Sequence, residues 1–264
     1  MSLRYFSFGG GVQSMAVLVL AAQGKLRYDQ FLFANVGHDS ENPATLLYLE
    51  NYARPYADEH DVDLVELHHT RYGKPETLLG HIRRSERSLP LPVRMSNGAP
   101  GRRTCTSDFK IEVIARYQKQ RGATPDAPAV AALGISVDEW QRARTDSGIA
   151  WQVLEYPLLD LRMNRRDCTK VIEEAGLPVP PKSSCWFCPF HSRGEWLRMK
   201  REEPEQFQRA VELERLLNER RARLGRDEIY LHASAQPLEH AVGDQYAFEF
   251  DESDMPCDTG YCFV

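Results

Sequence analysis

Two sets of residues in this 264-residue chain have the types and spacing needed for chemistry: a run of three glycines and a group of cysteines. The glycines stand within residues 7–14, Ser-Phe-Gly-Gly-Gly-Val-Gln-Ser, where an apolar run ends and a helical pattern begins. A strand, a glycine turn and a helix start point several backbone N–H groups at one small volume. We therefore expect an anion there, in the first place a nucleotide phosphate. An ordinary tight strand-to-helix turn is the alternative reading of the same pattern.

The cysteines form the second set. Cys185 and Cys188 make a Cys-x-x-Cys pair in a proline-rich loop, and Cys105 precedes them in the sequence. In a reducing compartment such a pair indicates metal or redox chemistry more often than packing. His191 could join the three thiols, and a set of three cysteines and one histidine would favour zinc.

The composition is that of a globular protein, with 42% hydrophobic residues, 27% charged residues and a net charge of −5. No stretch approaches the roughly 18 apolar residues needed to cross a bilayer. The first apolar segment is broken at once by the glycines, which is unlike a signal peptide. These features predict a cytoplasmic protein with no membrane segment.

The elements that must position these residues alternate between strand and helix. After a first strand at the amino terminus, strands are expected at residues 30–36, 62–68, 129–135 and 151–156. Helices are expected at residues 43–60, with Pro55 disturbing the middle, and at 137–143, 164–174 and 195–223. Strands separated by long helices imply parallel βαβ units. The expected fold class is α/β, a doubly wound, mostly parallel five-stranded sheet with a C-terminal helical extension.

The expected domains are a nucleotide-binding α/β domain over residues 1–190 and a helical extension with a tail over residues 191–264. The first includes a long insert, residues 69–107, and the cysteine loop, residues 183–190. A connection as long as this insert usually serves a site, as a lid or a binding loop. Its basic residues far outnumber its acidic ones, so we expect it to contact phosphate or sulfate, with a solvated loop as the alternative.

Five segments in the same order resemble the motifs of one known group of proteins. The glycine turn is similar to that group's loop of the type Ser-Gly-Gly-x-Asp-Ser. The other four segments are residues 34–37 with 43 and 45, residues 103–106 with 110, residues 134–135 with 142, and residues 156–160. Over roughly residues 3–195 the chain resembles the PP-loop adenine nucleotide alpha-hydrolase superfamily, and within it the phosphoadenylyl-sulfate (PAPS) reductase-like family. The resemblance implies a Rossmann-like fold that binds an adenine nucleotide.

The resemblance also implies roles for particular residues. Those expected to bind the nucleotide are Ser7, Phe8, Gly9, Gly10, Gly11, Gln13, Ser14, Asn35, Gly37, Gly134 and Arg142. Those expected to act in catalysis are Arg103, Lys110 and Asp160. The implied cofactor is ATP or another adenine nucleotide. Mg²⁺ is a further candidate, held by the phosphates and by a carboxylate such as Asp39 or Asp160.

An iron–sulfur branch of the family has a cysteine element followed, at a similar separation, by a Cys-x-x-Cys pair, and it holds a 4Fe-4S cluster. The resemblance implies a cluster on Cys105, Cys185 and Cys188. A cubane cluster needs four ligands, usually thiolates, and Cys168 is the candidate for the fourth. A buried core thiol is the alternative for Cys168, because Val171 shares its apolar helix face. Further alternatives are zinc in place of the cluster and an iron left open to external sulfide or substrate.

Two departures from the family pattern bear on the reaction. Gln13 stands where ATP-cleaving members have an aspartate that helps to organise Mg²⁺, and an amide cannot neutralise a cation. The terminal Glu-Cys-Gly-x-His element of the true sulfonucleotide reductases is missing, although the tail thiols Cys257 and Cys262 could substitute for its cysteine.

Three functions follow from the resemblance. The leading one is ATP-dependent sulfur transfer (thiolation) assisted by an iron–sulfur cluster, with a sulfur-donor protein as partner and tRNA, DNA or a small molecule as acceptor. The second is reduction of a sulfonucleotide, in which a thiolate attacks the sulfur atom. The third is a non-catalytic nucleotide-binding or redox-sensing protein, which the glutamine at position 13 favours.

Overall fold

The computed structural model describes residues 3–243, so Cys257 and Cys262 lie outside the described residues. Contacts within the described chain divide it into two compact units. The first unit holds residues 3–78 and 106–184, and the second holds residues 79–105 and 185–243. The cysteine loop and most of the long insert were expected within residues 1–190 as parts of one domain, and this division groups them with the C-terminal helices instead.

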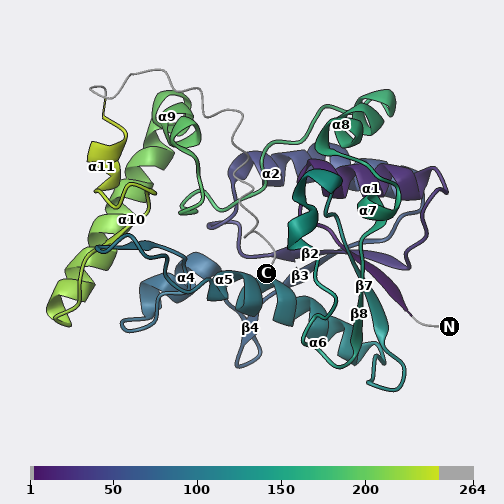
Figure 1. The fold of residues 1–264 in the computed structure, drawn as a ribbon, viewed down its shortest axis with the longest axis horizontal. Helices are drawn as coiled ribbons and strands as arrows, with labels where there is room; N and C mark the ends of the chain where they lie inside the picture. Colours follow the sequence, from purple (N-terminus) through teal and green to yellow (C-terminus); the bar gives the residue numbers. More distant parts are fainter. Residues whose placement is uncertain (1–2, 244–264) are drawn as a thin grey trace. The chain divides into compact units, whose positions relative to one another are not determined.

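The first unit is built on a five-stranded, all-parallel sheet in the order β3-β2-β1-β7-β8 (Figure 1). Its strands are β1 (Arg4–Ser7), β2 (Gln30–Asn35), β3 (Leu64–His68), β7 (Ala129–Leu133) and β8 (Gln152–Glu155). In the register, Phe6 of β1 lies beside Phe31 of β2 and Ala132 of β7. The expected α/β fold class with a doubly wound sheet is confirmed.

Helices cover both faces of this sheet, which is why the middle residues of its central strands, β1, β2 and β7, are apolar and buried. On one face, α1 (Val12–Ala22) and α8 (Arg165–Glu174) pack over Phe6, Phe31 and Phe33. On the other face, α6 (Glu112–Gln120) packs over Tyr5, Leu32 and Ala34. Neighbouring strand residues point to opposite faces, so the two sets alternate along β1 and β2. Figure 1 shows α1 and α8 on one side of the sheet and α6 on the other.

The order of the strands reverses next to β1. From β1 the chain adds β2 and then β3 on one side, and it later adds β7 and then β8 on the other side. In open α/β sheets, ligands bind beyond the carboxyl ends of the strands at such a switch point. The glycine turn follows β1 and Gly134 follows β7, so both lie at the switch point.

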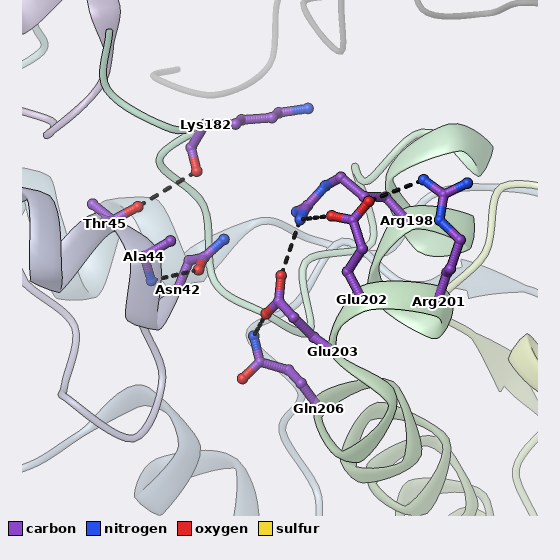
Figure 2. Close-up of polar contacts among 9 residues, drawn as sticks. All are labelled: Asn42, Ala44, Thr45, Lys182, Arg198, Arg201, Glu202, Glu203 and Gln206. Carbon is purple, nitrogen blue, oxygen red and sulfur yellow. Dashed lines mark hydrogen bonds and ion pairs between the residues drawn. The ribbon is translucent and has the colours of Figure 1, made fainter. Parts of the chain in front are cut away.

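The helix expected over residues 43–60 is continuous but contains a widened turn. It consists of α2 (Pro43–Tyr48), the π-helical segment η1 (Leu49–Ala53) and α3 (Arg54–Glu59). Pro55 has no N–H to donate, and the π turn accommodates the missing hydrogen bond. Asn42 caps the start of α2, because its side-chain oxygen accepts the Ala44 N–H at 2.9 Å (Figure 2).

The other elements of the first unit are short. They are the hairpin of β4 (Thr70–Arg71) and β5 (Lys74–Pro75), the π-helical segment η2 (Ser107–Ile111), the 3₁₀ segment η3 (Val137–Arg142) and α7 (Pro157–Asp160). The capping signals expected around α8 are confirmed. Asn164 accepts the Asp167 N–H at 2.9 Å, and Gly176 adopts φ +76° just after the helix.

The second unit joins the middle of the chain to the C-terminal helices. Its elements are α4 (Leu78–Arg84), β6 (Arg94–Met95), α9 (Arg193–Glu202), α10 (Pro204–Arg223), β9 (Ile229–Tyr230) and α11 (Leu238–Ala241), while α5 (Thr104–Thr106) leads back to the first unit. β6 pairs with β9, and Arg220 of α10 donates to the carbonyl of Ile82 at 2.9 Å and to that of Arg83. These contacts satisfy acceptors that the last turn of α4 leaves open, so the insert folds with α10.

The prediction of a single helix over residues 195–223 is wrong, because two helices occupy this segment. The chain leaves the helical conformation at Glu203, with φ −132° and ψ 56°, because the residue before a proline is disfavoured in the helical region and Pro204 follows. At this corner Arg198 lies 3.3 Å from Glu202 and 3.0 Å from Glu203, and Gln206 also bonds Glu203 (Figure 2). Exposed pairs of this kind add little stability, so the corner depends on the proline. No helix in the described part of the chain is long and apolar enough to cross a membrane.

A buried carboxylate on α10 ties the end of the second unit to this helix. Glu214 is 4% exposed, and its two oxygens accept the backbone N–H groups of Leu231 at 2.6 Å and Leu238 at 2.7 Å. Burial raises the pKa of Glu214 above its ordinary value, despite these two hydrogen bonds. Its ionised form is therefore less favourable in the folded protein than in the unfolded chain.

We expect Glu214→Gln to destabilise the protein by about 1–3 kcal/mol, because an amide can accept only one of the two N–H groups. A carboxyl group whose pKa is raised on folding stabilises the protein below its unfolded pKa, and this contribution is lost as the pH rises through the folded pKa. The stability difference between the native chain and the variant should therefore narrow as the pH rises above 4.5, the ordinary value. Urea unfolding of both proteins at several pH values measures this difference in the free energy of unfolding. Glu219→Gln, at an exposed position of α10, is the control, and a difference that widens with pH would contradict the assignment.

Candidate nucleotide-binding site

The glycine turn connects β1 to α1. Gly10 adopts φ +74°, in the left-handed region that favours glycine, and Gly11 caps the helix with an extended backbone. The Ser14 hydroxyl accepts the Gly11 N–H at 3.1 Å and donates to the Gly11 carbonyl at 2.9 Å. Ser14, predicted as a nucleotide ligand, therefore closes the first turn of α1. The other N–H groups in the first turn of α1 have no hydrogen-bond acceptor within the helix, because the helix begins only here. They can therefore bind an anion.

Two of the glycines are also needed because other side chains come close to them. A Cβ atom on Gly10 would lie 3.0 Å from the Thr45 methyl carbon, and a Cβ atom on Gly11 would lie 2.8 Å from the Ser183 hydroxyl oxygen. A side chain at either position would therefore displace a neighbour. The turn is built for close approach, as the sequence predicted.

Residues 182–184, at the start of the cysteine loop, lie beside the turn. The Thr45 hydroxyl donates to the Lys182 carbonyl at 3.4 Å (Figure 2), and the Asn42 N–H donates to the Ser184 carbonyl at 3.1 Å. The Ser184 hydroxyl oxygen is buried and has no hydrogen-bond partner among the described residues. These residues were missed from the sequence. The signal was the Lys-Ser-Ser order itself, since a cation and two hydroxyls suit an anion.

A second loop reaches the turn from the end of β7. A Cβ atom on Gly134 would lie 3.5 Å from the Cβ of Gln13 and 3.3 Å from the ring of Phe6, so the two loops pack closely. The structure thus brings together two predicted residues that are far apart in the sequence. Ser136, which was not predicted, is fully buried nearby in the chain, and its hydroxyl has no hydrogen-bond partner among the described residues.

Gln13 also contacts the start of α8. Its side-chain oxygen accepts a hydrogen bond from the Arg165 guanidinium at 3.2 Å, and the Arg165 backbone N–H donates to Asp138 at 2.7 Å. A shallow cavity, wide open to solvent and with a volume of ≈570 Å³, lies at this place, lined by Asp138, Asn164, Arg165, Arg166 and Thr169. Arg165 was missed from the sequence because the contact joins residues 152 positions apart.

The loop after β2 is shaped by two predicted residues. The Asn35 side chain accepts the Gly37 N–H at 2.7 Å and donates to Glu66 of β3 at 2.7 Å. Gly37 adopts φ +121°, and a Cβ atom there would lie 2.5 Å from Thr77. Both residues therefore hold the loop in place. Asp39, considered as a carboxylate for Mg²⁺, accepts the hydroxyl of Thr77 at 3.0 Å.

Lys110 meets a buried carboxylate that was not predicted. Glu41, in the loop after β2, is 2% exposed, and one of its oxygens lies 3.5 Å from the Lys110 ammonium group. Glu41 stands beyond the carboxyl end of β2, so Lys110 brings a positive charge to the edge of the sheet that carries the glycine turn. Lysine and carboxylate depend on each other there, because an isolated buried charge is costly.

Four further predicted residues belong to the first unit. Ser7 belongs to β1, and Phe8 is 3% exposed in the core beside the helices, so its side chain packs rather than binds a ligand. Arg142 is buried and paired with Glu139. Asp160 is exposed, at the end of α7. Ser7 and Phe8 lead directly into the glycine turn, and the roles predicted for all four residues stay predictions.

Asp160 contributes to the electrostatic surroundings of Tyr28. Burial, then the charge of Glu155, and less strongly the charge of Asp160 raise the pKa of Tyr28 to about 12. Tyr28 precedes β2 and therefore stands at the amino-terminal edge of the sheet, opposite the glycine turn. The Mg²⁺ role considered for Asp160 stays a prediction.

The second unit holds Cys105, Cys185 and Cys188. The last two belong to the cysteine loop, which also carries aromatic residues. The Cys188 N–H donates to the Cys185 carbonyl at 3.0 Å, and a ring nitrogen of His191 lies 3.0 Å from that same carbonyl. One ring nitrogen of His191 is therefore engaged with the backbone, and the other lies 3.6 Å from a carboxylate oxygen of Glu195. Arg103 lies over the Phe190 ring at 5.2 Å, and the Cys105 N–H donates to the Pro90 carbonyl at 2.9 Å.

The predicted 4Fe-4S cluster is not shown by the described residues. No group of three or more His, Cys, Asp or Glu side chains in residues 3–243 is placed to hold a metal ion. Cys168, the candidate fourth ligand, is 0% exposed and belongs to the core formed with α1. Its helix turns the cysteine inward together with Ile172, which is the alternative that the sequence left open.

Cys168 should resist alkylation in the native protein. Burial, with smaller contributions from Asp138 and Asp167, raises the pKa of its thiol to about 12 from 9.0, so at pH 8 the reactive thiolate is rarer by on the order of a thousandfold. Mass mapping after iodoacetamide treatment should find Cys168 unmodified until a denaturant is added. Rapid modification of Cys168 in the native chain would contradict its place in the core.

A scan against protein-family models gives no match, and no curated protein matches the chain. Among solved structures, the chain is similar to the crystal structure of phosphoadenylyl-sulfate (PAPS) reductase from Candida auris in its phosphate complex, with a TM-score of 0.46 and 15% sequence identity. The match covers 68% of this chain and 76% of that chain. The name is that of the family that the sequence motifs resemble. This likeness concerns the fold, and what the chain binds depends on its own residues.

Proposed function

We propose that this chain is an adenine-nucleotide-binding enzyme of sulfur metabolism whose glycine turn holds the phosphates. The observation that carries the proposal is the meeting of two loops at the switch point of the sheet, where Gly134 packs against Gln13. Open N–H groups at the start of α1 and the cations Arg165 and Lys110 support an anion in this region. The choice of adenine rests on the motif resemblance.

The leading reaction is ATP-dependent sulfur transfer. An oxygen of the acceptor attacks the α-phosphorus of ATP, the bond to the β-phosphate oxygen breaks, and pyrophosphate leaves with the electron pair. Hydrosulfide from a donor then attacks the activated carbon, and the carbon–oxygen bond breaks as AMP leaves. The N–H groups of the turn would stabilise the charge that builds on the phosphates. The acceptor would be tRNA, DNA or a small molecule. Mg²⁺ would be bound mainly through the phosphates, and no step passes through an iron–sulfur cluster.

Reduction of a sulfonucleotide is the second candidate, and one contact favours it. The Gln13 side-chain oxygen accepts a hydrogen bond from the Arg165 guanidinium. A cation therefore lies beside the position at which ATP-cleaving relatives have a carboxylate for Mg²⁺. A sulfonucleotide needs only cations and N–H groups for its anionic end. In this reaction a thiolate attacks the sulfur atom, the sulfur–oxygen bond breaks and the nucleotide phosphate leaves. A second thiol then releases sulfite as a disulfide forms.

Two assays on the full chain separate these functions. Release of pyrophosphate from ATP with Mg²⁺ and an added hydrosulfide donor would support sulfur transfer. Release of sulfite from a sulfonucleotide with a dithiol reductant would support reduction. Nucleotide binding without either product would replace the enzyme by a nucleotide-binding sensor. The proposal fails if calorimetry detects no binding of ATP, AMP or a sulfonucleotide.

A further inference from the structure

The cavity at the start of α8 is lined by residues to which the sequence analysis assigned no role in nucleotide binding or catalysis. Arg165 and Arg166 bring two positive charges to its lining, and Asp138 brings one negative charge. Asn164 and Thr169, which complete the lining, are neutral. The Asp138 carboxylate already accepts the Arg165 backbone N–H at 2.7 Å. A lining with a net positive charge and one engaged carboxylate suits an anion better than a divalent cation.

The cavity is joined to the glycine turn through Arg165. The guanidinium of this residue donates to the Gln13 side-chain oxygen at 3.2 Å, and Gln13 is in the first turn of α1. The guanidinium is therefore hydrogen-bonded to a side chain of the first turn of α1, the turn that the proposed function assigns to the phosphates. A glutamine oxygen fixes the guanidinium without neutralising it, whereas an aspartate at position 13 would form an ion pair with it.

We infer that Arg165 binds the phosphate chain of the nucleotide directly and supplies the counter-charge there, so that nucleotide binding does not require a divalent cation. The phosphate groups beyond the α-phosphate would enter the cavity beside Arg166. This inference rests on the proposed function, since it specifies how the same turn holds its nucleotide. It makes Gln13 a positioning residue for Arg165, and it gives a role to the glutamine that departs from the family pattern.

The test measures binding of ATP, adenosine and inorganic pyrophosphate to the full chain by calorimetry, once with Mg²⁺ and once with EDTA. The native chain should bind ATP with dissociation constants that agree within about threefold in the two buffers. Arg165→Gln should weaken ATP and pyrophosphate binding by about 10- to 100-fold, the usual effect of losing one or two charge-assisted hydrogen bonds. Adenosine has no phosphate, so its binding should not change.

Lys170→Gln is the matched control, because Lys170 is an exposed residue of the same helix that does not line the cavity and its replacement removes the same charge. It should change ATP binding less than twofold, and thermal unfolding should show that both variants fold. ATP binding that requires Mg²⁺, or equal losses in the two variants, would overturn the role of Arg165. A native chain that binds no adenine nucleotide in either buffer would refute the proposed function. In that case, pyrophosphate binding that depends on Arg165 would still support an anion site at this residue. If pyrophosphate does not bind either, the anion site is refuted as well.

Discussion

Replacing Gly10 with alanine is expected to weaken nucleotide binding at least tenfold, whereas Gly24→Ala leaves binding unchanged. The two glycines stand at opposite ends of α1 with nearly the same conformation, φ +74° and φ +72°. Alanine at either site adopts a left-handed backbone, which costs about 1–2 kcal/mol. Only at Gly10 does the new methyl group also meet a neighbour, since it would lie 3.0 Å from Thr45, while nothing lies within 4 Å at Gly24.

The pair of variants separates stability from binding. Urea unfolding should show that backbone strain lowers the free energy of unfolding by a similar amount in both variants. The contact with Thr45 should lower it further in Gly10→Ala. Calorimetry with ATP should then show a loss of affinity for Gly10→Ala alone, because the turn must shift and its N–H groups lose their common direction. Equal ATP affinities for the two variants would show that the nucleotide does not depend on the glycine turn.

Lys110→Met is expected to destabilise the protein by about 3 kcal/mol, because it leaves the carboxylate of Glu41 buried without its cation. Glu41 is 2% exposed and lies 3.5 Å from the Lys110 ammonium group. The double variant Glu41→Gln/Lys110→Met removes both charges and should recover most of the lost stability. Urea unfolding of the native chain, the two single variants and the double variant gives the coupling between the residues.

The same four proteins test the catalytic role predicted for Lys110. If the lysine acts on the nucleotide, the double variant should be stable and yet release no pyrophosphate or sulfite above the background rate. If the lysine only neutralises Glu41, the double variant should regain turnover together with stability. A Lys110→Met variant as stable as the native chain would show that the ion pair contributes nothing to folding.

Local signals in the sequence were sufficient for the sheet and for the first turn of the site. Apolar runs predicted all five strands of the main sheet, and the glycine run predicted the tight turn between β1 and α1 at its centre. Asn164 and Gly176 predicted both ends of α8. These signals work because strand periodicity, caps and left-handed glycines act over a few residues.

The remaining parts of the site depend on contacts between distant residues. Nothing near Gln13 in the sequence indicates Arg165, and nothing near Lys110 indicates Glu41, since each pair forms only when the sheet is assembled. Cys168 shows a second limit. Its spacing from Val171 and Ile172 fits a core position as well as a ligand position, and only the packing of α8 on α1 decides between them.

The second unit is assembled from two separate stretches of chain, so neither stretch can be removed without affecting the other. β6 in the middle of the sequence takes its strand partner from β9 near the end, and the exposed carbonyls of α4 are covered by an arginine of α10. A deletion of the C-terminal helices would strip an internal loop of its only described strand partner. The two stretches are therefore expected to be gained or lost together during evolution, and a trimmed expression clone should remove both.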